Sequence, residues 1–225
     1  PKIGYHFVRW EKDGVQVSTS ASYQVTNIQA DASYTAIFAP NTNTPYTVKH
    51  YQQNLDGTYP AVATDVDNLT GITGAPTAAE AKSYTGFTKV NFDQGTIAAD
   101  GSTVITINYT RNTYALSWVT DGDVLTGAYT SGLVLYGATI TAPNTPTKIG
   151  YTFAGWTPVT SATMPAEATT YTATWTPATV HYTVKHWQQN LANDDYTEVV
   201  GDREDKTGTT GTNTAAAAKS YTGFN

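Results

Sequence analysis

The chain has 225 residues, and 12 basic residues against 18 acidic ones give it a net charge of −6. This charge argues against a nucleic-acid-binding protein, which needs a basic surface, and against a polybasic protein of the membrane surface. The absence of cysteine excludes a disulfide scaffold, a cysteine-ligated zinc site and a thiol nucleophile. No run in the sequence approaches the roughly 20 consecutive apolar residues of a membrane helix.

The composition favours β-structure. The chain contains 43 threonines, 16 tyrosines and 5 tryptophans, and such residues suit a pleated, half-buried surface. Charged residues make up 13% of the chain, about half of the usual share of roughly 25%. We therefore expect a β-rich α+β protein with a composition suited to the outside of a cell.

Two kinds of sequence block occur twice, which indicates a repeat architecture. A block at residues 2–38 returns in looser form within 148–175. The other block returns in two segments. Tyr46–Leu55 returns as Tyr182–Leu191 with nine of ten residues identical, and residues 70–87 return as 207–224 with 14 of 18 identical. The composite period is therefore 136–137 residues.

We name the two alternating modules W-type and Y-type after their aromatic residues. Short, proline-bearing links between them favour a stiff string of modules. Because the outer modules begin or stop within a repeat, we expect a window from a longer array, in which both ends belong to complete domains or pair with another chain. The modules are a partial W-type module (1–39), a Y-type module (45–111), a W-type module (112–177) and a partial Y-type module (180–225).

Apolar and polar residues alternate in the Y-type module, which predicts three strands. Between the second and third strands, the alanine-rich run Thr77–Lys82 is predicted to be a helix, with Pro76 and Thr77 at its start and Gly86 beyond its end. The predicted strands are Tyr46–Tyr51, Val62–Val66 and Thr103–Thr110, with Tyr46, Val48, His50, Ile105, Ile107 and Tyr109 on the inward faces.

The W-type module is predicted to contain four strands. Two prolines, Pro143 and Pro146, exclude a long helix between the second and third strands. Asp121-Gly122-Asp123 is predicted to be a hairpin turn after the first strand. The four strands are Tyr114–Val119, Leu133–Tyr136, Tyr151–Trp156 and Tyr171–Trp175.

The W-type module carries a specific run of motifs: Tyr136-Gly137, Pro143, Gly-Tyr-Thr-Phe-Ala-Gly-Trp at 150–156, Met164-Pro165 and Tyr-Thr-Ala-Thr-Trp at 171–175. This run resembles the Listeria–Bacteroides repeat, the B-repeat of internalin B. The partial module at 1–39 resembles it as well, although it lacks the Met-Pro pair and has Arg9 where the other copy has glycine before the tryptophan.

The Y-type module is similar to the mucin-binding-protein-like repeats of Gram-positive surface proteins. The similarity lies in Tyr-Thr-Val-Lys-His at 46–50, Thr-Gly-Ile-Thr-Gly at 70–74, and the pair Gly95 and Tyr109. Together the two resemblances imply tandem small β-grasp (ubiquitin-like) modules in an elongated array at a bacterial cell surface. They carry over no catalytic residues.

The aromatic residues permit two roles. Modules of about 65 residues bury a modest fraction of their surface and need large side chains to fill their cores, whereas exposed aromatics can stack on sugars. Trp187 takes the place of Tyr51 in the other copy and is expected to be partly exposed. We therefore expect Tyr51 and Trp187 as candidate surface contacts, and Trp118, Phe153, Trp156 and Trp175 in the structural core.

Other candidate chemistry is incomplete. His50 and His186 are equivalent, but no second ligand stands at metal-ligand spacing in both copies, so a structural role is expected. The acidic groups Asp65/Asp67, Asp121/Asp123, 193–195 and 202–205 lack the alternating ligands of a calcium loop. A Lys49–Asn108 isopeptide bond with Glu80 as proton carrier is disfavoured, because Lys49 and Asn108 face away from the predicted core.

No Ser/His/Asp set recurs between the copies, so we expect no enzyme, no cofactor and no metal. The favoured hypothesis is a segment of a large repetitive surface protein that acts as an adhesin stalk or spacer, with weak multivalent contacts to host or neighbouring-cell glycans or proteins, or to further copies of its own repeats. The alternatives are a carbohydrate-binding array that uses exposed Tyr and Trp, and a self-assembling extracellular fibre. The expected location is the bacterial cell surface, either attached to the cell wall or secreted.

Overall fold

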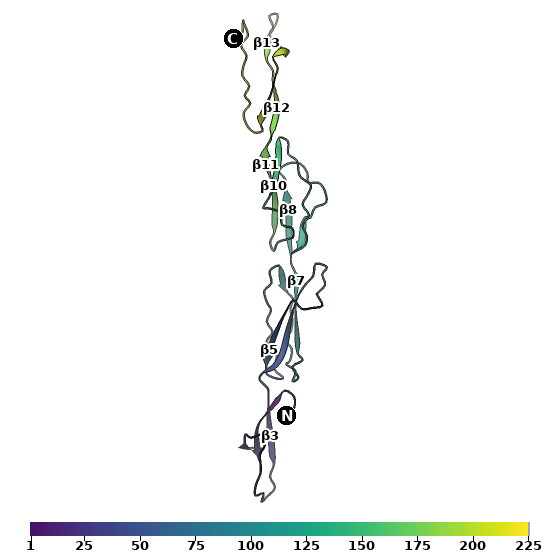
Figure 1. Cartoon of the computed structure of the whole chain (residues 1–225), viewed down its shortest axis with the longest axis vertical. Coiled ribbons are helices and arrows are strands. Elements are labelled where there is room, and N and C mark those ends of the chain that lie inside the picture. The colour runs from purple at the N-terminus through teal and green to yellow at the C-terminus, as the bar shows by residue number, and fades with distance from the viewer. Residues whose placement is uncertain (225) are drawn as a thin grey trace. The chain divides into compact units, whose positions relative to one another are not determined.

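Short β-strands dominate the computed structural model, which describes residues 1–224 (Figure 1). The chain separates into two units, Pro1–Thr113 and Tyr114–Asn225. Among the described residues the helical content is one 3-10 turn, Val200–Asp202, and no helix there is long and apolar enough to cross a membrane. The expected β-rich class is confirmed, in the form of several small sheets.

The first unit begins with a three-stranded antiparallel sheet in the order β2-β1-β3. Phe7 packs on one side against Trp10 and on the other against Phe38, with ring centroids 5.8 and 5.9 Å apart. Phe38 remains 43% exposed, so one face of this sheet is only partly covered. The strands are β1 (Tyr5–Lys12), β2 (Val15–Ser18) and β3 (Tyr34–Pro40).

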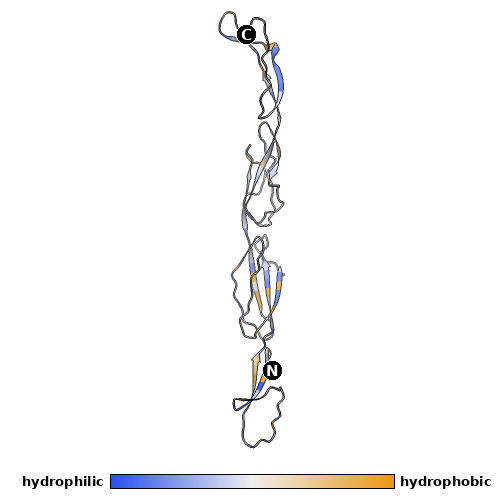
Figure 2. Ribbon diagram, turned by 90° about the vertical axis from the view of Figure 1, so that its left-hand side faces the viewer, coloured by the Kyte–Doolittle hydropathy of each residue, from blue (hydrophilic) through white to orange (hydrophobic). Residues whose placement is uncertain are grey.

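The Y-type module forms a mixed four-stranded sheet in the order β5-β4-β7-β6, in which β4 and β7 are parallel. The predicted inward faces are confirmed: Tyr46, Val48 and His50 on β4 and Ile105, Ile107 and Tyr109 on β7 are all at most 7% exposed. Figure 2 shows hydrophobic and hydrophilic residues interspersed along the strands. The strands are β4 (Thr44–Gln52), β5 (Asp65–Gly71), β6 (Phe87–Lys89) and β7 (Val104–Arg111).

Two predictions for this module are wrong. The second strand begins at Asp65, and Val62 is 80% exposed outside it. Thr77–Lys82 is extended and not helical. Six residues make too few backbone bonds to offset helix nucleation, and the segment finds better partners elsewhere: Gln94 accepts from the Ala79 amide and donates to the Ala79 carbonyl.

The W-type module forms a second mixed sheet, in the order β10-β11-β8-β9, with β8 and β11 parallel. Its topology therefore matches that of the Y-type module, since the first and last strands are the central parallel pair in each. All four predicted strands are present, with boundaries shifted by one or two residues: β8 (Thr113–Val119), β9 (Gly132–Leu135), β10 (Tyr151–Thr157) and β11 (Thr169–Pro177).

The predicted hairpin turn at Asp121-Gly122-Asp123 is wrong, because β9 starts well beyond it at Gly132. These residues form a bend instead, in which Asp121 accepts a hydrogen bond from Lys148 and Asp123 accepts one from Thr147. The core of the module consists of buried side chains from three strands and one loop: Leu116, Trp118, Val134, Met164 and Tyr171.

The partial Y-type module forms two small antiparallel pairs, β12 with β15 and β13 with β14. In β12 and β15, Tyr182 lies opposite Lys206 and Val184 opposite Glu204. This is the register of β4 and β5, in which Tyr46 lies opposite Leu69 and Val48 opposite Asp67 at the same repeat spacing. The strands are β12 (Thr179–Val184), β13 (Trp187–Gln189), β14 (Tyr196–Glu198) and β15 (Glu204–Thr209).

Candidate functional site

Each unit contains one joint, which we define as the backbone connection between a W-type module and the Y-type module that follows it. In the first joint, the Asn41 amide donates to the Gly4 carbonyl at 2.8 Å, and the Thr73 amide donates to the Asn41 carbonyl at 2.9 Å. The joint thus links three segments that are far apart in the sequence. Its bonds depend on the backbone and therefore survive most side-chain changes.

The second joint repeats the first, with Ala178 and Thr210 in the places of Asn41 and Thr73, and Gly150 in the place of Gly4. The Ala178 amide donates to the Gly150 carbonyl at 2.8 Å, and the Thr210 amide donates to the Ala178 carbonyl at 2.9 Å. Asn41 and Ala178 are equivalent but chemically unlike, which confirms that the side chain at this position is not what holds the joint. Two separate units with the same pattern of bonds indicate a connection built into the repeat.

Glycine is required at both joints. Gly4 and Gly150 have φ of +81° and +78°, a conformation that costs other L-residues roughly 1–2 kcal/mol. A Cβ atom on Gly4 would lie 2.6 Å from the Ala99 Cβ, and one on Gly150 would lie 2.7 Å from the Thr210 Oγ1. The close approach of the two modules therefore leaves no room for a side chain.

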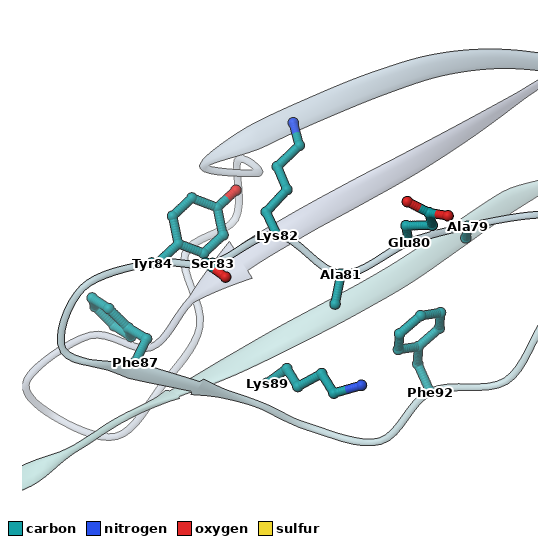
Figure 3. Close-up of a pocket in the computed structure, with 9 residues that line it drawn as sticks. All are labelled: Ala79, Glu80, Ala81, Lys82, Ser83, Tyr84, Phe87, Lys89 and Phe92. Atoms are coloured by element: carbon teal, nitrogen blue, oxygen red, sulfur yellow. The ribbon is translucent and has the colours of Figure 1, made fainter.

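The Y-type module also contains a polar cluster around the buried His50, which we call the first ionic cluster: His50, Asp65, Asp67, Lys82 and Tyr84. Lys82 Nζ lies 2.6 Å from an Asp65 oxygen and 2.7 Å from an Asp67 oxygen. In Figure 3 Lys82 projects from the extended segment away from Phe92. The cluster thereby holds the segment Thr77–Lys82 against β5.

His50 is completely buried and bonded on both sides. Its Nε2 lies 3.1 Å from Asp67 and its Nδ1 lies 2.8 Å from the Tyr109 hydroxyl. A carboxylate only accepts, so Nε2 carries a proton, while the direction of the bond between Nδ1 and Tyr109 depends on the tautomer of the ring. The Tyr109 oxygen in turn accepts from the Lys82 amide at 2.8 Å. This agrees with the expected structural role of His50.

The partial Y-type module repeats this arrangement in a second ionic cluster, formed by His186, Asp202, Glu204, Lys219 and Tyr221. His186 Nε2 lies 3.2 Å from Glu204, and Lys219 Nζ lies 3.2 Å from Asp202. Tyr221 donates to Asp202 at 2.7 Å. Glutamate replaces one aspartate, but each charge keeps its position, so the cluster belongs to the repeat.

The clusters shift the acidity of their members. Hydrogen bonds from Lys82 lower the pKa of Asp65 and Asp67 and raise the pKa of Lys82. Desolvation, together with the bond to Asp202, raises the pKa of Tyr221 to about 12. These directions keep Lys82 as an ammonium ion and both aspartates as carboxylates at neutral pH, which suits an ion pair and not a nucleophile.

A pH dependence follows from the lowered carboxylate pKa values. Between the ordinary pKa of 3.8 and the lowered pKa values of the folded state, the unfolded chain binds more protons than the folded chain. The free energy of unfolding should therefore decrease as the pH decreases through this range. We expect the urea midpoint of the first unit to drop between pH 5 and pH 3. Lys82→Met should shrink that drop, while the exposed control Lys89→Met should retain it. Equal drops in both variants would contradict a stabilising role for Lys82.

The predicted core aromatics differ in burial. Trp118 is 8% exposed and packs against Tyr171 and Trp156, with ring centroids 4.6 and 4.8 Å away. Trp156 is only half-buried at the edge of this core. Phe153 and Trp175 are also half-buried and contact each other outside the core, at 5.7 Å. β10 lies at the edge of the sheet, so Phe153 and Trp156 have a neighbouring strand on one side only.

The predicted surface contacts also differ from each other. Trp187 is 54% exposed, whereas its counterpart Tyr51 is half-buried. Among residues 1–224, no group of three or more His, Asp or Glu side chains is placed to hold a metal ion. The register sets Lys49 opposite Thr106, not opposite Asn108, and the lysine that carboxylates surround is Lys82.

Sequence reasoning missed the joints and the ionic clusters. Taken by themselves, Asp65/Asp67 and 202–205 are separate calcium candidates, and nothing local connects either group with a lysine. The available signal was the repeat spacing, because it aligns Asp65 with Asp202, Asp67 with Glu204, and Lys82 with Lys219.

Two family models match parts of the chain. Residues 114–181 match the Listeria–Bacteroides repeat domain, and residues 1–42 match the divergent InlB B-repeat domain. Both matches cover the W-type segments and confirm the resemblance stated for them, while residues 45–111 receive no match from either. No curated protein and no solved structure is similar enough to the chain to add a relative.

Proposed function

We propose that the chain is a non-enzymatic spacer in a repetitive bacterial surface protein, where it holds an adhesive domain away from the cell. The observation that carries this proposal is the joint, which recurs in both units with the same four backbone groups and the same glycine. A spacer needs such a fixed connection, because its reach depends on it.

The finer assignments belong to the same proposal. The mixed sheets, with first and last strands central and parallel, support β-grasp modules in tandem. The Y-type module would be a mucin-binding-protein-like repeat on the strength of its sequence motifs alone. The two family matches support a location at the bacterial surface.

Glycan binding is the less favoured role. It calls for aromatics exposed at equivalent places in both copies, yet Trp187 is open where Tyr51 is half-buried. Strong and specific hits for the chain on a glycan array would reverse this order of preference.

A reach assay tests the spacer role. The 225-residue chain is placed between a surface anchor and a fluorescent binding domain, and the height of that domain above the cell is measured. The control is a Gly/Ser linker of equal length, whose r.m.s. end-to-end distance is about 80 Å. We expect the chain to hold the domain higher than the linker does, and a height equal to or below that of the linker would refute the proposal.

A further inference from the structure

The first and last strands of each complete module lie side by side and parallel. In the Y-type module, β4 pairs with β7 from Thr47 opposite Val104 to Gln52 opposite Tyr109, six opposed pairs of residues in all. The start of β4 therefore lies at one end of this pair of strands, and the end of β7 lies at the other. In a parallel pair the backbone hydrogen bonds are evenly spaced along the strands.

The chain enters and leaves the Y-type module through these two strands with almost no slack. Three residues, 41–43, separate β3 from β4, and Asn112 alone separates β7 from β8. A pull on the backbone from outside the module therefore acts on Thr44 at the start of β4 and on Arg111 at the end of β7. Because these points lie at opposite ends of the parallel pair, the pull slides the two strands past each other and loads their hydrogen bonds together.

The ladder between β4 and β7 is closed at both ends and covered on one face. At its start the Thr47 amide donates to the Thr103 carbonyl at 3.0 Å, and at its end the Gln53 amide donates to the Tyr109 carbonyl at 2.9 Å. Beside the point where the chain leaves, the Gln53 side-chain oxygen accepts from the Arg111 amide at 3.0 Å. The inward side chains keep water from one face of the ladder, since each is at most 7% exposed: Val48, His50, Ile105, Ile107 and Tyr109.

The W-type module has the same arrangement with a shorter ladder. Its first and last strands, β8 and β11, are parallel over four opposed pairs of residues, from Leu116 with Thr169 to Val119 with Thr172. The chain enters β8 directly after Asn112 and leaves β11 through the single residue Ala178. A pull on the backbone therefore loads this pair of strands in the same way, but over fewer hydrogen bonds.

We propose that each of the two complete modules is a mechanical clamp, in which the parallel pair of first and last strands carries tension along the chain in shear. Several hydrogen bonds must then break in one step before the module unfolds, whereas bonds that are pulled open from one end break one after another. Unfolding under force is governed by the unfolding rate, so the clamp slows unfolding without requiring a higher equilibrium stability. The inference rests on the spacer role only for the source of the tension, since an adhesive domain that holds a target pulls on its spacer.

Two pulling directions on the same module test the clamp. The chain lacks cysteine, so pairs of introduced cysteines can attach the handles for optical tweezers at chosen exposed positions of the whole chain. Thr42→Cys with Thr113→Cys pulls the Y-type module in shear. Leu55→Cys with Thr113→Cys pulls at the ends of β4 and β7 that lie together, and so peels the two strands apart. We expect unfolding in shear to need at least about twice the force of unfolding by peeling.

A third pair of handles compares the two modules. Thr113→Cys with Thr179→Cys pulls the W-type module in shear and should unfold it at a lower force than the Y-type module, because its ladder is shorter. The urea midpoint of each variant should equal that of the unaltered chain, so that a difference in force reflects the direction of the pull.

Equal forces for shear and peeling of the Y-type module would overturn the proposal. A W-type module that resists shear more than the Y-type module does would overturn the parallel ladder as the element that carries the load. The reach assay is independent of both results: a chain that holds its domain high but shows equal forces would refute the clamp and leave the spacer role standing.

Discussion

Replacement of Tyr109 by alanine is expected to lower the free energy of unfolding of the Y-type module by roughly 3–5 kcal/mol, the range for a buried large aromatic. Tyr109 is 1% exposed at the centre of the core, and its ring stacks edge-on against Tyr84 at 4.8 Å. A loss of this size approaches the whole stability of a small domain. Hydrogen exchange of residues 44–111 in the full chain measures it.

Two further variants separate the ring from the hydroxyl. Tyr109→Phe leaves the Lys82 amide and His50 without their shared partner, which should cost about 1–3 kcal/mol. Thr106→Ala lies on the exposed face of the same strand and should cost little. If Tyr109→Ala were as mild as Thr106→Ala, the module would not depend on this core.

Trp118→Ala should destabilise the W-type module by a similar amount, roughly 3–5 kcal/mol. Besides its ring contacts, the Trp118 indole N–H donates to the Thr130 carbonyl at 2.8 Å, so the change also leaves a carbonyl unpaired. Trp175→Ala should cost clearly less, because that ring is half-buried. Urea unfolding followed by tryptophan fluorescence compares them, and equal losses would show that burial does not rank these two residues.

The strands could be predicted well because the alternating pattern that indicates a strand lies within the strand's own residues. Alternation with a period of two placed Tyr46, Val48 and Ile107 on the inward faces, and the structure buries all three. The helix predicted for the alanine-rich run at 77–82 is wrong for the same reason, because the local propensity favours a helix. In the structure, Gln94 and Tyr109 accept hydrogen bonds from backbone amides of this segment in an extended form.

The ionic clusters and joints could not be predicted locally. Lys82 meets Asp65 only after the segment between them folds back, and the need for glycine at position 4 arises from Ala99, far along the chain. The repeat carried part of this information, since Asp65 and Lys82 recur as Asp202 and Lys219, and Gly4 recurs as Gly150. The edge position of β10 explains why Phe153 and Trp156 are less buried than their aromatic character suggested.

The most direct measurement of the joint is a pair of spin-label distances, which the absence of cysteine makes simple. Double variants Thr35→Cys with Thr70→Cys, and Thr172→Cys with Thr207→Cys, place labels at exposed and equivalent positions across the two joints. We predict two narrow distance distributions with the same mean, and Gly4→Ala should broaden only the first. Broad distributions, or different means for the two pairs in the unaltered joints, would contradict a connection fixed by the repeat.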